Sequence, residues 1–180
     1  MDAFTNPTAT SLLTSPSHAQ QHADINDAME AVQTKLAIGN TVLGTYTAYT
    51  PTWIGLTIGN GTSNFKFARV NNLVHYVGVF TFGTTSAITG SVNISLPVNA
   101  STLYSTLNFV PFGPCLFVDA SAVLPYEATG IGITSINTAR LRYKQIPSGT
   151  AVVNGNISAT VPFTWTTSDT ITIDFTYEAL

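Results

Sequence analysis

Charged residues are scarce in this sequence of 180 residues. Only 8% of them are Asp, Glu, Lys or Arg, whereas an ordinary soluble domain has about 25%. Hydrophobic residues still make up 44% of the chain, so the low charge does not indicate disorder. The net charge of −3 lacks the basic excess of nucleic-acid-binding domains, and we expect no nucleic-acid partner. A mean hydropathy of +0.25 indicates apolar surface buried between subunits.

Cysteine and long apolar runs are also nearly absent. Cys115 is the only cysteine, which excludes an intrachain disulfide, and its apolar neighbours predict a buried side chain. The longest apolar run, Phe109 to Val118, is interrupted by two prolines and a glycine, and it is much shorter than the ~18 residues of a membrane span. The first residues show no basic stretch followed by an apolar core. We therefore expect neither secretion nor membrane insertion.

The patterns that carry enzyme chemistry or hold cofactors are missing as well. His75 is the only histidine after residue 44, and its apolar strand predicts a packed or hydrogen-bonded structural role rather than catalysis. The sequence contains no cysteine pair, no His-x-His and no glycine-rich phosphate loop. Asp119 and Glu127 are the one acidic pair left open for glycoside cleavage, although surface positions are favoured for both. We predict no enzyme activity, no cofactor and no metal site.

Residues 15–39 show the signals of a helix. Ser15 can cap its start, Pro16 suits the first helical position and Gly39 provides a stop. A stripe with alternating steps of four and three residues runs along it, as in the a and d positions of a coiled coil: His18, His22, Ile25, Met29, Val32 and Leu36. The alternative is an amphipathic helix packed on its own domain. The narrow stripe favours a coiled coil, and β-branched residues at d favour three or more strands.

The six residues of this stripe form the predicted coiled-coil seam, and two of them are histidines. Rings of His18 and His22 around a symmetry axis could hold an anion when protonated or a metal when neutral. A polar layer that sets the register without any ligand is the favoured interpretation. Before the helix, residues 1–14 are rich in Thr, Ser and Asn, which predicts an extended arm.

From residue 44 onward the apolar residues recur with a period of two, which predicts strands. The clearest run, 170–178, alternates an apolar face with a Thr-rich and acidic face. Leu73–Phe82 is apolar on both faces, as in a central strand covered on each side. Further strands are predicted over Thr45–Thr50, Thr52–Ile58, Phe65–Val70, Ser91–Leu96, Cys115–Ala120, Gly130–Ile136, Arg140–Ile146 and Val161–Thr166. Short strands separated by turn signals predict an antiparallel β-sandwich or jelly roll over 44–180, so the chain is mainly β.

Charge is distributed unevenly over these strands. No Lys, Arg, Asp or Glu occurs between Val70 and Val118. Because a monomeric sheet normally protects its edges with charge, we expect much of this surface to lie against other copies of the chain.

A basic stripe and two tryptophans remain as candidate binding residues. Arg140, Arg142 and Lys144 alternate with apolar residues, so they share one face of a strand. The favoured interpretation is a solvated face paired with Asp174 and Glu178 on a neighbouring strand; the alternative is contact with an anionic polymer or another acidic component. We expect the side chains of Trp53 and Trp165 to pack in the core rather than to stack on sugar rings at the surface.

Three stretches together resemble one family. Ser15–Val32 resembles the short oligomerising helix in minor tail and fibre proteins of tailed bacteriophages, particularly actinobacterial ones. Tyr49–Trp53, with Gly59–Thr62, is similar to the opening of the β head that follows that helix. Val161–Trp165, leading to 175–179, resembles the last strands of that head.

The chain departs from these proteins at one turn. They often have a glycine before the strand that starts near Leu73, where this sequence has Asn71 and Asn72. Asparagine also tolerates a positive φ, so we expect the turn to be kept.

The resemblance implies a homotrimeric fibre or spike on the surface of a phage particle. The arm 1–14 would attach to other virion proteins, the trimeric coiled coil 15–39 would project the head, and the head 44–180 would face the host and contact its cell-wall glycan. The alternative is a capsid decoration or head-fibre protein with a purely structural role.

Overall fold

The computed structural model describes residues 18–36, 45–107, 110–132, 135–146 and 151–180. The chain divides into two units, Met1–Leu43 and Gly44–Leu180. The described part of the first unit is the helix α1 (His18–Leu36), which lies within the predicted range 15–39. The predicted arm 1–14, the cap Ser15–Pro16 and the stop Gly39 lie outside the described residues.

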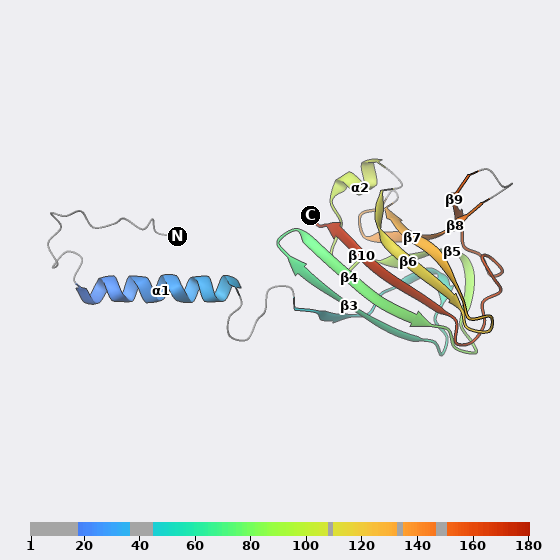
Figure 1. The fold of residues 1–180 in the computed structure, drawn as a ribbon, viewed down its shortest axis with the longest axis horizontal. Coiled ribbons are helices and arrows are strands. Elements are labelled where there is room, and N and C mark those ends of the chain that lie inside the picture. Colours follow the sequence, from blue (N-terminus) through green and yellow to red (C-terminus); the bar gives the residue numbers. More distant parts are fainter. Residues whose placement is uncertain (1–17, 37–44, 108–109, 133–134, 147–150) are drawn as a thin grey trace. The chain divides into compact units, whose positions relative to one another are not determined.

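The second unit is built on an antiparallel β-sheet (Figure 1). A mainly β, antiparallel unit was predicted, and this coarse prediction is confirmed. Its strands lie in the order β1-β3-β4-β10-β6-β7-β8-β5-β2, and β9 also pairs with β8. Their bounds are β1 (Thr47–Tyr49), β2 (Trp53–Thr57), β3 (Thr62–Val70), β4 (Leu73–Thr81), β5 (Ala87–Ser95), β6 (Pro111–Asp119), β7 (Leu124–Gly132), β8 (Thr138–Gln145), β9 (Val153–Asn156) and β10 (Thr170–Glu178), with a short helix α2 (Thr102–Leu107) after β5.

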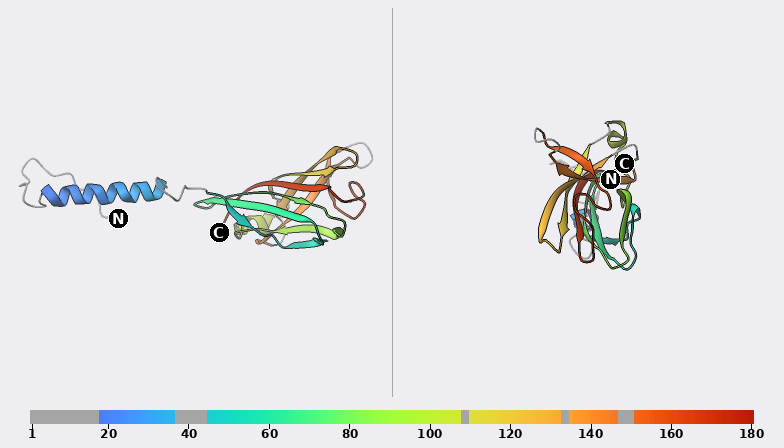
Figure 2. Two further views of the ribbon diagram at one scale, coloured as in Figure 1. Left: turned by 90° about the horizontal axis from the view of Figure 1, so that it is seen from below. Right: turned by 90° about the vertical axis from the view of Figure 1, so that its right-hand side faces the viewer.

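The sheet curls until its two ends meet (Figure 2). The end strands β1 and β2 are consecutive in the chain, and the residues between Tyr49 and Trp53 span at most about 14 Å. A flat sheet of this strand order would separate them by roughly 38 Å. Ser95 of β5 holds the junction, because its Oγ lies 2.8 Å from the Tyr49 hydroxyl and accepts a hydrogen bond of 2.9 Å from the Thr52 amide.

The core fills the inside of this curl. Strands β4 and β10 contribute its largest fully buried side chains, among them Tyr76, Phe80 and Phe175. Trp53 of β2 packs on Phe80 of β4 at a ring distance of 5.6 Å, although the two strands are not neighbours in the sheet. Aromatic contact across the curl therefore joins one end of the sheet to its middle.

Strand β10 shows the predicted alternation. Ile171, Ile173, Phe175 and Tyr177 are buried, while the residues between them are half-buried or exposed. The predicted turn at Asn71 is also confirmed, since this residue has a φ of 52° between β3 and β4.

Other predictions about the strands were wrong. Val161–Thr166 forms one isolated bridge, between Val161 and Ser158, instead of a strand. Pro162 has no amide for a ladder, and the Thr166 amide donates to the side chain of Asp169. The segment still supplies aromatic side chains to the core, including Phe163.

Two further differences concern β7 and β4. Strand β7 begins at Leu124, six residues before the predicted start at Gly130, and both α2 and β9 were not predicted. On β4, both faces are apolar as predicted, but the outward side chains of Val77 and Val79 remain half-buried in the single chain instead of fully covered.

Asp169 ties three segments together at one end of the sheet. Its side chain is fully buried and accepts hydrogen bonds from the amides of Ala120 and Thr166, at 2.9 and 2.5 Å. Its backbone carbonyl accepts a bond of 2.9 Å from the amide of Phe82, just beyond β4. The turn after β6, the end of β4 and the start of β10 therefore depend on one residue.

We expect Asp169→Ala to lower the free energy of unfolding by roughly 2–4 kcal/mol, because it leaves buried amide donors without acceptors. Chemical denaturation followed by tryptophan fluorescence measures this loss. Asp119→Ala is the matched control, since the Asp119 carboxylate accepts hydrogen bonds within the exposed turn that follows β6, and its loss should be smaller. Equal losses in the two variants would contradict this role of Asp169.

Candidate interaction surface

The outward face of the sheet carries a row of side chains across five strands. Direct pairing places Asn64, Val79, Thr172, Leu116 and Glu127 side by side on β3, β4, β10, β6 and β7. Residues that pair directly across strands point to the same face. On β4, β10 and β6 the adjacent residues, among them Phe80, Ile171 and Phe117, are buried in the core, so this row faces outward.

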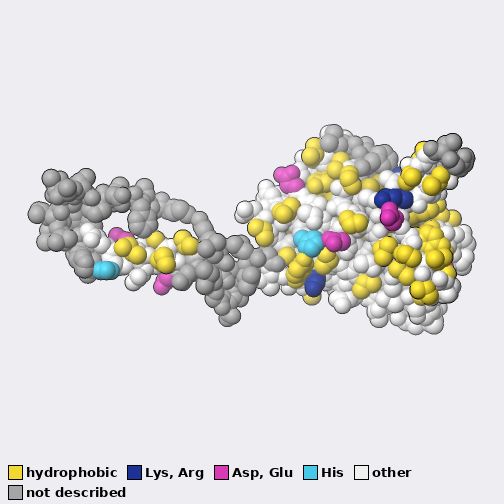
Figure 3. Space-filling view, in the orientation of Figure 1, with side chains coloured by type: hydrophobic (Ala, Val, Ile, Leu, Met, Phe, Trp, Pro, Cys, Tyr) yellow, Lys and Arg dark blue, Asp and Glu magenta, His cyan; other side chains and the backbone are white. Residues whose placement is uncertain are grey.

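A second, shorter row runs beside the first. Lys66 of β3, Val77 of β4 and Asp174 of β10 are paired in register. We call the two rows together, with Lys144 beside Glu127, the outer patch. Its middle is apolar or hydroxyl-bearing, and the side chain of Leu116 is 39% exposed. Figure 3 shows few charged side chains on this face, with apolar and uncharged surface between them.

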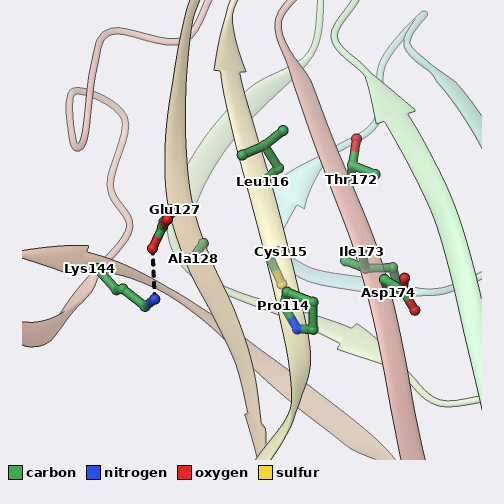
Figure 4. Close-up of a pocket in the computed structure, with 9 residues that line it drawn as sticks. All are labelled: Pro114, Cys115, Leu116, Glu127, Ala128, Lys144, Thr172, Ile173 and Asp174. Atoms are coloured by element: carbon green, nitrogen blue, oxygen red, sulfur yellow. Dashed lines mark hydrogen bonds and ion pairs between the residues drawn. The ribbon is translucent and has the colours of Figure 1, made fainter.

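Two shallow hollows lie on either side of β10 within the outer patch. The first, of about 390 Å³, is bordered by Leu116 and Thr172 and by the Glu127 and Lys144 side chains (Figure 4). The second, of about 400 Å³, lies over Val77 and Val79 and has Lys66 at its margin. Both are open to solvent, so they are features of a surface and not enclosed cavities.

An ion pair borders the first hollow. Lys144 Nζ donates to Glu127 Oε2 at 2.7 Å. The hydrogen bond from the ammonium group and its charge lower the pKa of the Glu127 carboxyl. Both side chains are exposed, so we expect the pair to contribute little to stability.

A chain of three polar side chains lies at the end of the second row. His75 Nε2 is 2.7 Å from Asp174 Oδ1, and its Nδ1 is 2.5 Å from the Tyr46 hydroxyl. Lys66 Nζ lies 4.7 Å from the centre of the Tyr46 ring, in the geometry of a cation–π contact. An aspartate that orients an imidazole beside a hydroxyl prepares the imidazole to accept the hydroxyl proton as a general base. Here the array is open to water, with the side chains of His75 and Asp174 38% and 62% exposed.

His75 is hydrogen-bonded on its strand, as predicted. Its partner Asp174 is 99 residues away in the chain, so local sequence patterns contain no signal for the contact. The pairing of β4 with β10 brings the two residues together.

The basic stripe on β8 has other partners than predicted. Arg140 Nε donates to Asn93 Oδ1 at 3.1 Å, and Lys144 pairs with Glu127. Arg142 is half-buried on the same face. The predicted pairing with Asp174 and Glu178 is wrong, because β6 and β7 separate β8 from β10 in the sheet.

The candidate acidic pair is not assembled. Leu116 pairs directly with Glu127, while Asp119 pairs with Leu124 at the end of the ladder, which separates the two acids by about 10 Å along the strands. Asp119 accepts hydrogen bonds from Ser121 and the Ala122 amide, which lower the pKa of its carboxyl.

The tryptophans and the cysteine pack as predicted. Trp165 stacks on Phe82 at 4.9 Å and donates from Nε1 to the Ser158 carbonyl, and Trp53 also packs against the core. Cys115 is 5% exposed, and burial raises the pKa of its thiol. The thiol therefore stays protonated and shielded.

The predicted seam lies on α1. All six seam residues fall within His18–Leu36, and helical spacing places Ile25, Met29 and Val32 on one face. Ile25, Met29 and Val32 are 49%, 56% and 50% exposed, and His22 is exposed as well. Figure 3 shows the apolar side chains on this helix. A row of half-exposed apolar side chains is a second surface suited to association.

Within the described ranges, no three His, Cys, Asp or Glu side chains converge on a point that a metal ion could occupy. Neither described helix has the length and apolar character needed to cross a bilayer. Comparison with protein-family models, curated proteins and solved structures finds no match.

Proposed function

We propose that this protein is a structural appendage of a tailed-bacteriophage particle, a homotrimeric fibre or spike that contacts the host surface. In this proposal α1 is the trimeric coiled-coil stem, and residues 44–180 form a head of the sandwich or jelly-roll type. The arm 1–14 binds other virion proteins, and the head faces the cell-wall glycan of the host.

The observation that carries the proposal is the exposed seam of α1. Most helical stability in proteins comes from the packing of an amphipathic face, so we expect this helix of 19 residues to need packing partners. Ile25, Met29 and Val32 are about half exposed, and burying the remainder stabilises an assembly by about 1 kcal/mol per side chain. Three helices that each contribute such a seam would form a bundle.

The charge-poor head supports the same proposal. A protein with few charges and much hydroxyl-bearing surface associates more readily than one with strong like-charge repulsion. The resemblance of Ser15–Val32 and of the head segments to phage fibre proteins supplies the biological setting.

We expect the wild-type chain to sediment as a trimer and Met29→Lys to sediment as a monomer at micromolar concentration. Three lysines in one seam repel one another and lose their apolar contacts. Ala31→Lys is the matched control, because it adds the same residue at an exposed position of the same helix outside the seam. Since Met29 is 56% exposed in the single chain, a monomeric protein would tolerate both variants alike. That result would contradict the coiled coil.

The position of the protein in a virion tests its biological role. Particles labelled with gold-tagged antibodies against residues 44–180 should carry the label on the tail when imaged by electron microscopy. Label spread over the capsid in numbers that match lattice positions would favour the capsid-decoration alternative. Particles without label would refute a virion role.

A further inference from the structure

The outer patch is built in a way that suits contact with copies of itself. Its centre, Val77, Val79, Thr172 and Leu116, is uncharged and lies on three adjacent strands. The charged groups of the patch are two lysines and two acids, and Lys144 is paired with Glu127 at its margin. Lys66 lies at the edge of the second hollow, and Asp174 of β10, which borders both hollows, is hydrogen-bonded to His75. An apolar centre with polar groups at the margin is the usual composition of a protein interface.

Rotational symmetry explains why the balance of positive and negative charge in the outer patch matters. In a cyclic trimer, a group close to the axis faces the same group in the other two copies. An unbalanced charge there would meet its own sign, which costs free energy in a desolvated interface. A face whose charges have partners within one chain lowers this cost, as Glu127 with Lys144 and Asp174 with His75 do in the outer patch.

We propose that three copies of this chain turn their outer patches toward a common axis, so that the heads pack on one another through β4, β10 and β6. This inference rests on the proposed trimeric stem and identifies the second surface that holds the assembly together. The two hollows beside β10 then receive side chains of the neighbouring copies.

The size of the patch explains why the stem is needed. Five strands spaced by about 4.8 Å and about 30 Å long present roughly 600 Å² over their whole outward face, of which the two rows of the outer patch are only a part. A stable interface buries about 800 Å² on each partner, so the patch alone is too small to hold heads together at micromolar concentration. Heads tethered to one helical bundle have an effective concentration of about millimolar, at which a weak contact forms.

Protection of an introduced thiol tests the contact directly. Thr172→Cys places a thiol in the middle of the outer patch, and Thr89→Cys places one at an exposed position of β5. Each is made in the full chain, both alone and together with Met29→Lys, which separates the stems. We expect alkylation by a maleimide at position 172 to be at least tenfold slower in the trimer than in the monomer. Position 89 should react equally fast in both, and the buried Cys115 gives a low background.

Charge insertion gives an independent measurement. Leu116→Glu and Thr172→Glu place three like charges in the shared face without touching the core, whereas Thr89→Glu adds the same charge outside the patch. We expect the trimer of each patch variant to dissociate at a concentration at least tenfold higher than the trimer of the control. Near-UV circular dichroism reports that each head remains folded.

The outcomes separate this inference from the proposed function. A trimeric wild type with a protected position 172 and weakened patch variants supports both. A trimeric wild type in which position 172 reacts equally fast in trimer and monomer, and in which the patch variants match the control, overturns the packed heads and leaves the stem intact. A monomeric wild type overturns both.

Discussion

The residues between Tyr49 and Trp53 join strands that lie at the two ends of the sheet. This short covalent link requires the sheet to bend until its ends meet, and the hydrogen bonds of Ser95 hold the junction. Successive side chains along a strand point to opposite faces of the sheet. The direction of the bend therefore decides which of the two faces is enclosed. The aromatic core, with Trp53 against Phe80 across the curl, is a consequence of that closure.

The same closure creates the outer patch. Once the large aromatic side chains have filled the inside, the residues between them must face outward, and on β4 and β10 these are Val77, Val79 and Thr172. The solvated face of an antiparallel sheet normally carries polar residues at such positions. Charge is limited to the Glu127–Lys144 pair and Lys66 at the margin, and to Asp174 of β10, which is hydrogen-bonded to His75. The fold therefore presents a nearly neutral face with two shallow hollows, and α1 presents a second surface with exposed apolar side chains.

Local patterns predicted much of the fold and failed where distant contacts decide. The strict alternation of 170–178 predicted β10, because each side chain there follows the period of two. Val161–Thr166 has a similar appearance, yet Pro162 cannot join a ladder and Asp169 takes the amide of Thr166. The predicted partners of Arg140 and Lys144 were wrong for a related reason, since the order of strands in a sheet depends on the paths of the loops between them.

The sequence by itself determined a helix with an apolar stripe followed by antiparallel strands, and it determined which residues of β10 face inward. Short-range periodicity encodes these features, because they depend on residues two to four positions apart. Only the tertiary structure decided that Asp174 meets His75, that Glu127 meets Lys144, and that the outward rows of five strands form one surface. Those contacts join residues far apart in the chain, and they exist because the sheet curls and places particular strands side by side.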